Sequence, residues 1–164
     1  MLRAGVFPAA VSHGAGAARL KHMKPQQSPL KRSLAALLAL TMGGNGLAML
    51  AAGHWWYGVT PGVTMTGPFN PHFVKDIGAA YVVVGVAFAW LAAKPSPVAR
   101  GATAAAALFL GLHAGVHLTD AIGDSGGLAH LVRDFPGVIA PALLAAWIAA
   151  AYPGEETRDA QSPA

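Results

Sequence analysis

The stretch of sequence that decides the fold is FVKDIGAAYVVVGVAFAWLAA, residues 73–93, which carries no charged side chain after Asp76. An apolar run of this length is what an α-helix needs to cross a hydrocarbon core of about 30 Å. Three further runs share this character, and none of them has a charge at its centre. They cover residues 34–53, 99–118 and 135–152. The sequence therefore predicts an all-α polytopic membrane protein, folded as a bundle of four transmembrane helices.

The composition of the whole chain agrees with a lipid environment. Of its 164 residues, 54% are hydrophobic and 11% are charged, whereas an ordinary soluble domain has roughly 25% charged residues. This length predicts one four-helix membrane domain at residues 34–152, between a disordered basic tail at 1–33 and a disordered tail at 153–164. The absence of cysteine excludes disulfides, thiolate metal sites, iron–sulfur clusters and a cysteine nucleophile.

The lysine and arginine residues predict the orientation of the helices. The N-terminal tail carries six of them, the turn between the second and third runs carries two, and the C-terminal tail carries one, which makes nine on one side against two on the other. Membrane proteins keep such residues in the cytoplasm. We therefore expect a multi-pass protein of the bacterial inner membrane with cytoplasmic N- and C-termini. The basic tail has no aromatic platform beside it, so we expect no nucleic-acid partner.

The third run carries four polar side chains with a spacing of 0, 4, 7 and 11, namely His113, His117, Asp120 and Asp124. At about 100° per residue, all four fall within about 60° of one helix face. Histidines four residues apart can bind the same metal ion, and a carboxylate one turn further on can be a third ligand or can orient an imidazole. Ionisable groups inside a membrane helix are costly enough to mark a candidate functional site.

A second polar group is expected at the outer end of the second run. Asn70 predicts the N-cap of a helix that starts at the following proline, and His72 and Asp76 then share one face four residues apart. His54 and His130 are expected at the same end, beside or within the two external loops. The predicted metal site comprises His113, His117, Asp120, His72 and Asp76, as ligands for zinc, copper or iron.

Other positions predict structural roles. Gly111 and Gly115 form a small-xxx-small pair that would let another helix approach closely. Asn45 is expected to hydrogen-bond in helix packing, Asp134 to cap the fourth helix, and Pro141 to kink that helix.

One motif resembles a known group of proteins. It is carried by WY at 56–57, PGV at 61–63, TGPFN at 66–70, HFV at 72–74 and DIG at 76–78. In this motif the chain resembles small, uncharacterised four-helix inner-membrane proteins of bacteria, and it is more loosely similar to the DoxX-like class. The resemblance covers roughly residues 34–91 and implies a four-helix bundle. DoxX-like proteins are linked to membrane-associated redox and quinone systems, but no catalytic residue can be matched, so the resemblance assigns no role to any side chain.

The sequence leaves several functions open. The leading hypothesis is a His/Asp site at the periplasmic end of the bundle that binds a transition metal or relays protons for a membrane redox partner. A non-catalytic accessory or assembly subunit is the alternative, in which the polar stripe only docks helices, within the chain or in a homo-oligomer. A third hypothesis is haem b held by His113 or His117 and a second histidine. The sequence does not identify an enzymatic reaction.

The orientation can be tested with reporter fusions. Because of the nine-to-two charge distribution, fusions after residues 62 and 126 should be active only with a periplasmic reporter. Fusions after residue 97 and at the C-terminus should be active only with a cytoplasmic one. A cytoplasmic signal at residue 62 would contradict the whole arrangement.

Overall fold

A computed structural model describes residues 28–123 and 126–151. Within them the chain is helical and contains no strand. Residues 1–27 of the predicted basic tail (1–33), the predicted tail at 153–164 and the candidate ligand Asp124 lie outside the described residues, whereas residues 29–33 of the basic tail belong to a helix. The elements, in chain order, are α1 (Pro29–Val59), the 3-10 turn η1 (Val63–Met65), α2 (Pro71–Ala93), α3 (Pro97–Gly123), α4 (Gly127–Asp134), the π-helical turn η2 (Phe135–Ile139) and α5 (Ala140–Ala150).

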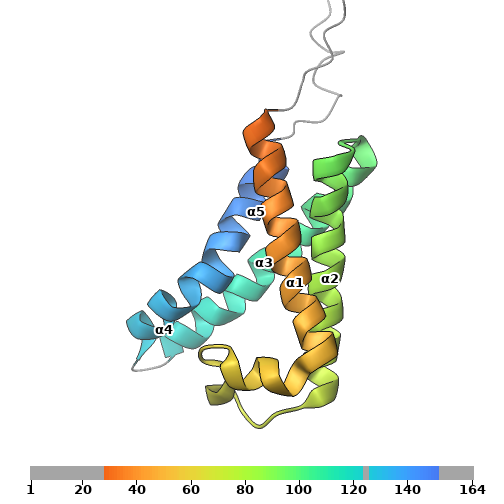
Figure 1. The fold of residues 1–164 in the computed structure, drawn as a ribbon. Coiled ribbons are helices and arrows are strands. Elements are labelled where there is room, and N and C mark those ends of the chain that lie inside the picture. The colour runs from red at the N-terminus through yellow and green to blue at the C-terminus, as the bar shows by residue number, and fades with distance from the viewer. Residues whose placement is uncertain (1–27, 124–125, 152–164) are drawn as a thin grey trace, which may run out of the picture.

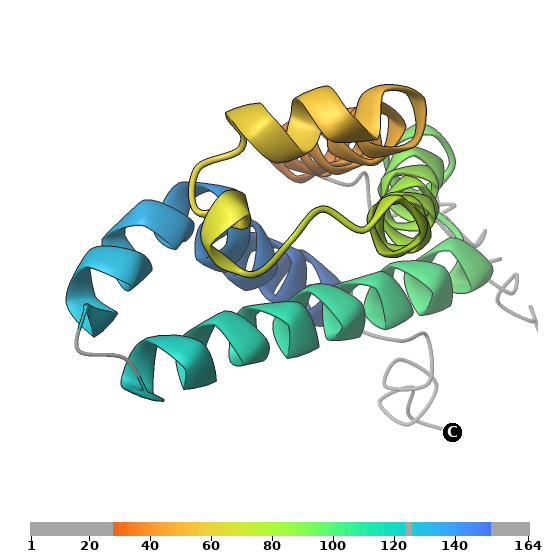
Figure 2. The same ribbon diagram turned by 90° about the horizontal axis from the view of Figure 1, so that it is seen from below.

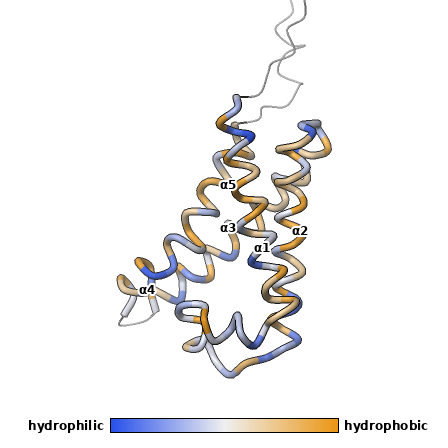
Figure 3. The backbone as a smooth tube through the Cα atoms, viewed as in Figure 1, coloured by the Kyte–Doolittle hydropathy of each residue, from blue (hydrophilic) through white to orange (hydrophobic). Residues whose placement is uncertain are grey.

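Four stretches of the described chain are long and apolar enough to cross a membrane, which confirms the predicted fold class. They are α1, α2, α3 and the continuous span Gly127–Ala150, which joins α4, η2 and α5. Less than 40% of each apolar window is buried inside the molecule, and hydrophobic residues follow most of the length of each span (Figure 3). Such outward apolar surface is what lipid solvates, so the chain is a multi-pass membrane protein.

Different segments of the chain form the two ends of the bundle (Figure 1). We call the end formed by residues 54–72 and 117–134 the loop end, and the end formed by the start of α1, residues 94–97 and the finish of α5 the terminal end. At the terminal end, Lys31 Nζ donates to the carbonyl of Ala151 and Arg32 Nε donates to that of Ala92, each at 3.0 Å. These cations satisfy carbonyl groups at the finish of α5 and α2, where positive charge is favourable.

The first helix is longer than its apolar run. It begins at Pro29 and ends at Val59, with non-helical backbone at Ala52 (φ −139°, ψ 43°). Beyond this kink the helix turns across the loop end (Figures 1 and 2). Trp56 Nε1 donates to Asn45 Oδ1 at 2.8 Å, although residues 45 and 56 would be about 16 Å apart along a straight helix. The predicted hydrogen bond of Asn45 therefore holds the kink, and His54 lies in a helix.

The second helix begins as predicted. Asn70 adopts an extended backbone, and its side-chain oxygen accepts from the backbone N–H groups of His72 and Phe73 at 3.1 and 3.2 Å. Pro71 occupies the first helical position. The cap fixes where the loop ends and places His72 and Asp76 in the first turns of α2.

Glycines let α1 and α2 approach to backbone contact. A Cβ atom on Gly46 would lie 2.5 Å from the carbonyl oxygen of Gly78, and one on Gly85 would lie 2.6 Å from the Cα of Gly43. Neither side chain would fit. Without a hydrophobic force between helices in lipid, such close van der Waals packing is a main source of association. These glycines thus bring the backbones of α1 and α2 into direct contact.

Two expectations about α3 and the fourth span need correction. No atom lies within 4 Å of a Cβ built on Gly111 or Gly115 among the described residues, so no described helix uses this pair. The face of α3 that is buried carries Ala99, Thr103 and Leu110 instead. The fourth span begins at Gly127 rather than 135. His130 consequently lies in a helix rather than a loop.

The irregularity expected at Pro141 takes the form of a wide turn. The N–H of Ala140 donates to the carbonyl of Phe135, five residues earlier, and residues 135–139 form the π-helical turn η2. Pro136 lies within this turn and Pro141 lies just after it, and each removes a backbone donor from the regular ladder. The turn keeps the span continuous.

The close α1–α2 packing generates a stability prediction. Gly46→Ala should lower the unfolding temperature in mild detergent, because the new methyl group meets backbone atoms of Gly78 and Val82; overpacking of this kind costs about 1–3 kcal/mol. Gly44→Ala is the matched control, since no atom lies within 4 Å of its Cβ position. Equal melting temperatures for the two variants would contradict the packing described.

Candidate functional site

Four side chains form a polar cluster inside the loop-end half of the bundle. We call His113 and His117 of α3 with Arg133 and Asp134 of α4 the His–Asp–Arg cluster. His117 Nδ1 lies 2.8 Å from Asp134 Oδ2. Arg133 donates from Nε to Asp134 Oδ1 at 2.6 Å and from Nη2 to Asp134 Oδ2 at 3.1 Å. The carboxylate is thus held from two sides, and Asp134 is only 9% exposed.

The α3–α4 hairpin brings these residues together. The chain reverses within a few residues after Gly123, so α4 returns beside the final turns of α3 (Figures 1 and 2). One side of α4 is apolar and exposed, with Leu128 and Val132 at 77% and 68%. Because this apolar side of α4 faces lipid, Asp134 lies on the inner side of the helix. There its carboxylate contacts His117, which is 17 positions earlier in the chain.

Asp134 was expected to cap the fourth helix, and that prediction is wrong. The helical span runs through Asp134, and its side chain makes no capping hydrogen bond. Pro136 suggested a helix start, since proline is favoured in a first turn. The sequence feature that could have revealed the role of Asp134 is the adjacent Arg133–Asp134 pair beside an apolar run. A carboxylate within a membrane span needs a balancing charge, and Arg133 can provide it. Arg133 is one of the two cations that the charge count places on the outer side of the membrane.

His113 continues the cluster toward the middle of the bundle. Its ring centroid lies 4.8 Å from that of His117, in an edge-on arrangement. It also lies 5.8 Å from the ring of Tyr81 and 6.2 Å from that of Phe109, which stacks on it. Tyr81 is buried and packs edge-on against Phe109. The polar cluster therefore ends at a pair of aromatic rings.

The predicted metal ligands are only partly brought together. His113 and His117 are neighbours, as their spacing predicted, whereas Asp120 is exposed on α3. His72 and Asp76 form their own pair at 3.3 Å, with side chains 88% and 63% exposed. Among the described residues there is no group of three or more His, Cys, Asp or Glu side chains that could hold a metal ion. The five-residue metal site stays a prediction.

The loop between α1 and α2 packs against Arg133. Met65 Sδ lies 3.6 Å from Arg133 Nη1, and a Cβ atom on Gly62 would lie within 2.8 Å of the guanidinium. Gly62 also has a φ of +83°, a backbone conformation that favours glycine. The loop is tied back to the bundle by Tyr57, whose hydroxyl donates to the carbonyl of Gly67 at 2.5 Å. Arg133 thus joins the cluster to this loop.

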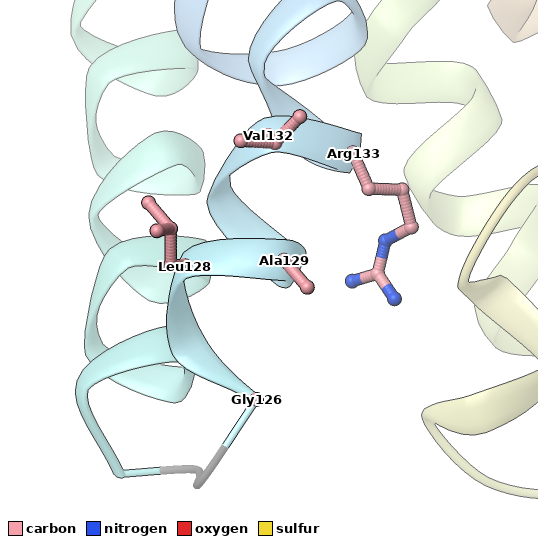
Figure 4. Close-up of a pocket in the computed structure, with 5 residues that line it drawn as sticks. All are labelled: Gly126, Leu128, Ala129, Val132 and Arg133. Carbon is pink, nitrogen blue, oxygen red and sulfur yellow. The ribbon is translucent and has the colours of Figure 1, made fainter.

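A hollow lies beside Arg133 on α4 (Figure 4). Its volume is about 600 Å³. The lining is apolar apart from the one guanidinium, and it consists of Gly126, Leu128, Ala129, Val132 and Arg133.

The side chains of the cluster are suited to binding a proton or to supplying some of the ligands of a metal ion. A carboxylate that contacts Nδ1 of an imidazole fixes the tautomer and the ring orientation, and it stabilises the cation when the ring is protonated. The same contact, with Nε2 left over, is how a carboxylate orients a metal-binding histidine. Arg133 balances Asp134 when His117 is neutral. When His117 is protonated, the carboxylate lies between two cations and the cluster carries one net positive charge, which solvent can help to stabilise because His117 is partly exposed.

Comparison with known proteins gives no assignment: no family model, curated protein or solved structure matches this chain.

The charge balance of the cluster generates a second stability prediction. Asp134→Leu should destabilise the protein in detergent by about 3 kcal/mol, because Arg133 would be left uncompensated in a partly buried position. The double substitution Arg133→Met with Asp134→Leu should recover most of this loss, since both charges are then removed. Chemical unfolding of the three proteins measures the difference. A double variant as unstable as the single one would show that the ion pair does not govern stability here.

Proposed function

We propose that this chain is a bacterial inner-membrane protein that binds and transfers protons at its periplasmic face for a membrane redox partner. Both termini are cytoplasmic in this proposal, and the loop end is periplasmic. The charge asymmetry of the sequence supports that orientation. The observation that carries the proton-transfer function is the 2.8 Å contact between His117 Nδ1 and the buried Asp134 carboxylate inside a membrane span.

The choice of residues supports proton chemistry. Histidine is the side chain that ordinarily changes charge between pH 5 and 8, and carboxylate–histidine chains within membranes are the usual proton relays. His117 is 28% exposed, whereas Asp134 is 9% exposed. A proton can therefore arrive at His117 from the loop end, while Asp134 holds the ring and balances the cation. His113, beside it, offers a second imidazole.

The distribution of ionisable groups favours chemistry at one face over transfer across the membrane. Every described aspartate and histidine lies in the loop-end half, where the residues are His54, His72, Asp76, His113, His117, Asp120, His130 and Asp134. Beyond Tyr81 and Phe109, the buried side chains toward the terminal end are apolar, such as Val84, Phe88 and Leu91, apart from Thr103, whose hydroxyl donates to the carbonyl of Ala99. A relay of this kind exchanges protons with one compartment and delivers them to a reaction at that face.

Transition-metal binding is the second candidate, and the same contact favours it. With Nδ1 on Asp134, His117 has Nε2 as its potential ligand atom, and the His113 ring lies 4.8 Å away. Two neighbouring imidazoles, one of them oriented by a carboxylate, resemble part of a zinc or iron site. A third ligand would have to come from water, a partner or a substrate. An accessory subunit would use the cluster only for packing, and haem b would require a second axial histidine.

Histidine NMR of the protein in lipid nanodiscs tests the proton proposal. The neutral ring of His117 should carry its proton on Nδ1, because Asp134 accepts it there, and the ring should take up a second proton reversibly when the pH is lowered. In Asp134→Asn this tautomer preference should be lost. His72, exposed on α2, provides the signal of a solvent-facing histidine in the same sample. A His117 ring that stays neutral at every pH at which the protein remains folded would overturn the proposal.

Elemental analysis of protein purified without chelators separates the metal candidate. Stoichiometric zinc, copper or iron that disappears in the variant combining His113→Ala and His117→Ala would favour a metal site. A Soret absorption band would indicate haem. A protein that neither titrates at His117 nor binds metal, yet melts at a lower temperature in the double variant, would be the accessory subunit.

A further inference from the structure

The hollow beside Arg133 lies at a depth that suits a lipid headgroup. Its residues belong to α4, at the loop end of a membrane span. Arg133 is six positions after Gly127, the first residue of that span, which is about 9 Å along the helix axis. Trp55, which is 62% exposed, lies at the same end, and tryptophan is enriched at the level of the headgroups. The hollow therefore faces the boundary between headgroups and acyl chains.

Arg133 has hydrogen-bonding capacity beyond its described partners. A guanidinium group has five N–H donors. Three of them are used, two by the carboxylate of Asp134 and one by the sulfur of Met65. Two N–H donors remain on a side chain that lines the hollow, and Figure 4 shows its nitrogens directed toward the open side. A ligand that fills the hollow should therefore carry oxygen atoms that accept hydrogen bonds from these donors.

The rest of the lining is apolar and exposed toward lipid. Leu128 and Val132 are 77% and 68% exposed, and Ala129 lies one turn before Arg133 on α4. A ligand for this hollow thus needs an oxygen-bearing anionic head for Arg133 and a hydrocarbon part for Leu128 and Val132. A phospholipid has both, and arginine binds phosphate through paired hydrogen bonds.

We propose that the hollow is a phospholipid site of the leaflet at the loop end, with the lipid phosphate on Arg133 and one acyl chain along Leu128 and Val132. One edge of the guanidinium stays on Asp134, and the other takes the phosphate. The bound lipid would secure Arg133 against Gly62 and Met65, and so would hold the loop between α1 and α2 in place. The proposal does not depend on proton transfer, because a lipid could bind Arg133 whether or not His117 changes its charge.

Native mass spectrometry of the detergent-purified full chain tests this site. Phosphatidylglycerol, diacylglycerol with the same acyl chains, and inorganic phosphate are added separately. The wild-type protein should retain one phosphatidylglycerol. Ala129→Trp, which fills the hollow without touching the His117–Asp134 contact, should weaken retention about tenfold through loss of the charge-assisted hydrogen bonds. Ala146→Trp is the matched control, because it places the same side chain on an exposed face of α5, and it should retain the lipid.

Each remaining outcome decides the proposal. Arg133→Gln should also release phosphatidylglycerol, and Ala129→Trp covers the case in which that variant does not fold. Retention by Ala129→Trp equal to that of the wild type would overturn the site. Equal retention of diacylglycerol would remove the role of the phosphate, and displacement of the lipid by inorganic phosphate alone would identify a soluble anion as the ligand instead. A lipid-free wild-type protein that still titrates at His117 would refute this site and leave the proposed function standing.

Discussion

The carboxylate of Asp134 lies inside a membrane span, and its charge has to be balanced there because lipid supplies no water for the purpose. His117 and Arg133 provide that balance from opposite sides. Through them one carboxylate connects α3, α4 and, by way of Met65, the loop that follows α1. The position of α4, the depth of the histidines and the seating of the loop all depend on this arrangement. The single carboxylate of Asp134 thereby holds together the segments at the loop end.

The contact between α1 and α2 depends on close packing rather than on charge. Gly46 and Gly78, and likewise Gly43 and Gly85, bring two helices together at backbone distance. This packing needs no polar group. The terminal end is secured separately by Lys31 and Arg32, which satisfy carbonyl groups at two helix C-termini. Packing therefore stabilises the middle of the molecule, and charges stabilise its two ends.

The sequence predicted the four spans because apolar length is a one-dimensional property that can be read without knowing any partner. The ends of the helices were harder to predict from the sequence. Residues 54–59 and 127–134 contain too many polar and aromatic side chains to continue an apolar run, yet both are helical. The shared face of His113 and His117 followed from spacing alone. Their partner did not, because Asp134 comes from another helix and its own neighbourhood resembled a cap. For the same reason, Gly111 and Gly115 suggested a contact that the described chain does not make.

The aromatic pair at the inner edge of the cluster has an electrical consequence. Tyr81 and Phe109 separate the histidines from an apolar half that contains no described aspartate or histidine. Moving one elementary charge across the full membrane costs about 2.3 kcal/mol per 100 mV. A proton that reaches His117 from the loop end crosses only the outer part of that field. In the proposed function, proton binding at His117 would therefore depend on the acidity of one compartment far more than on the membrane potential.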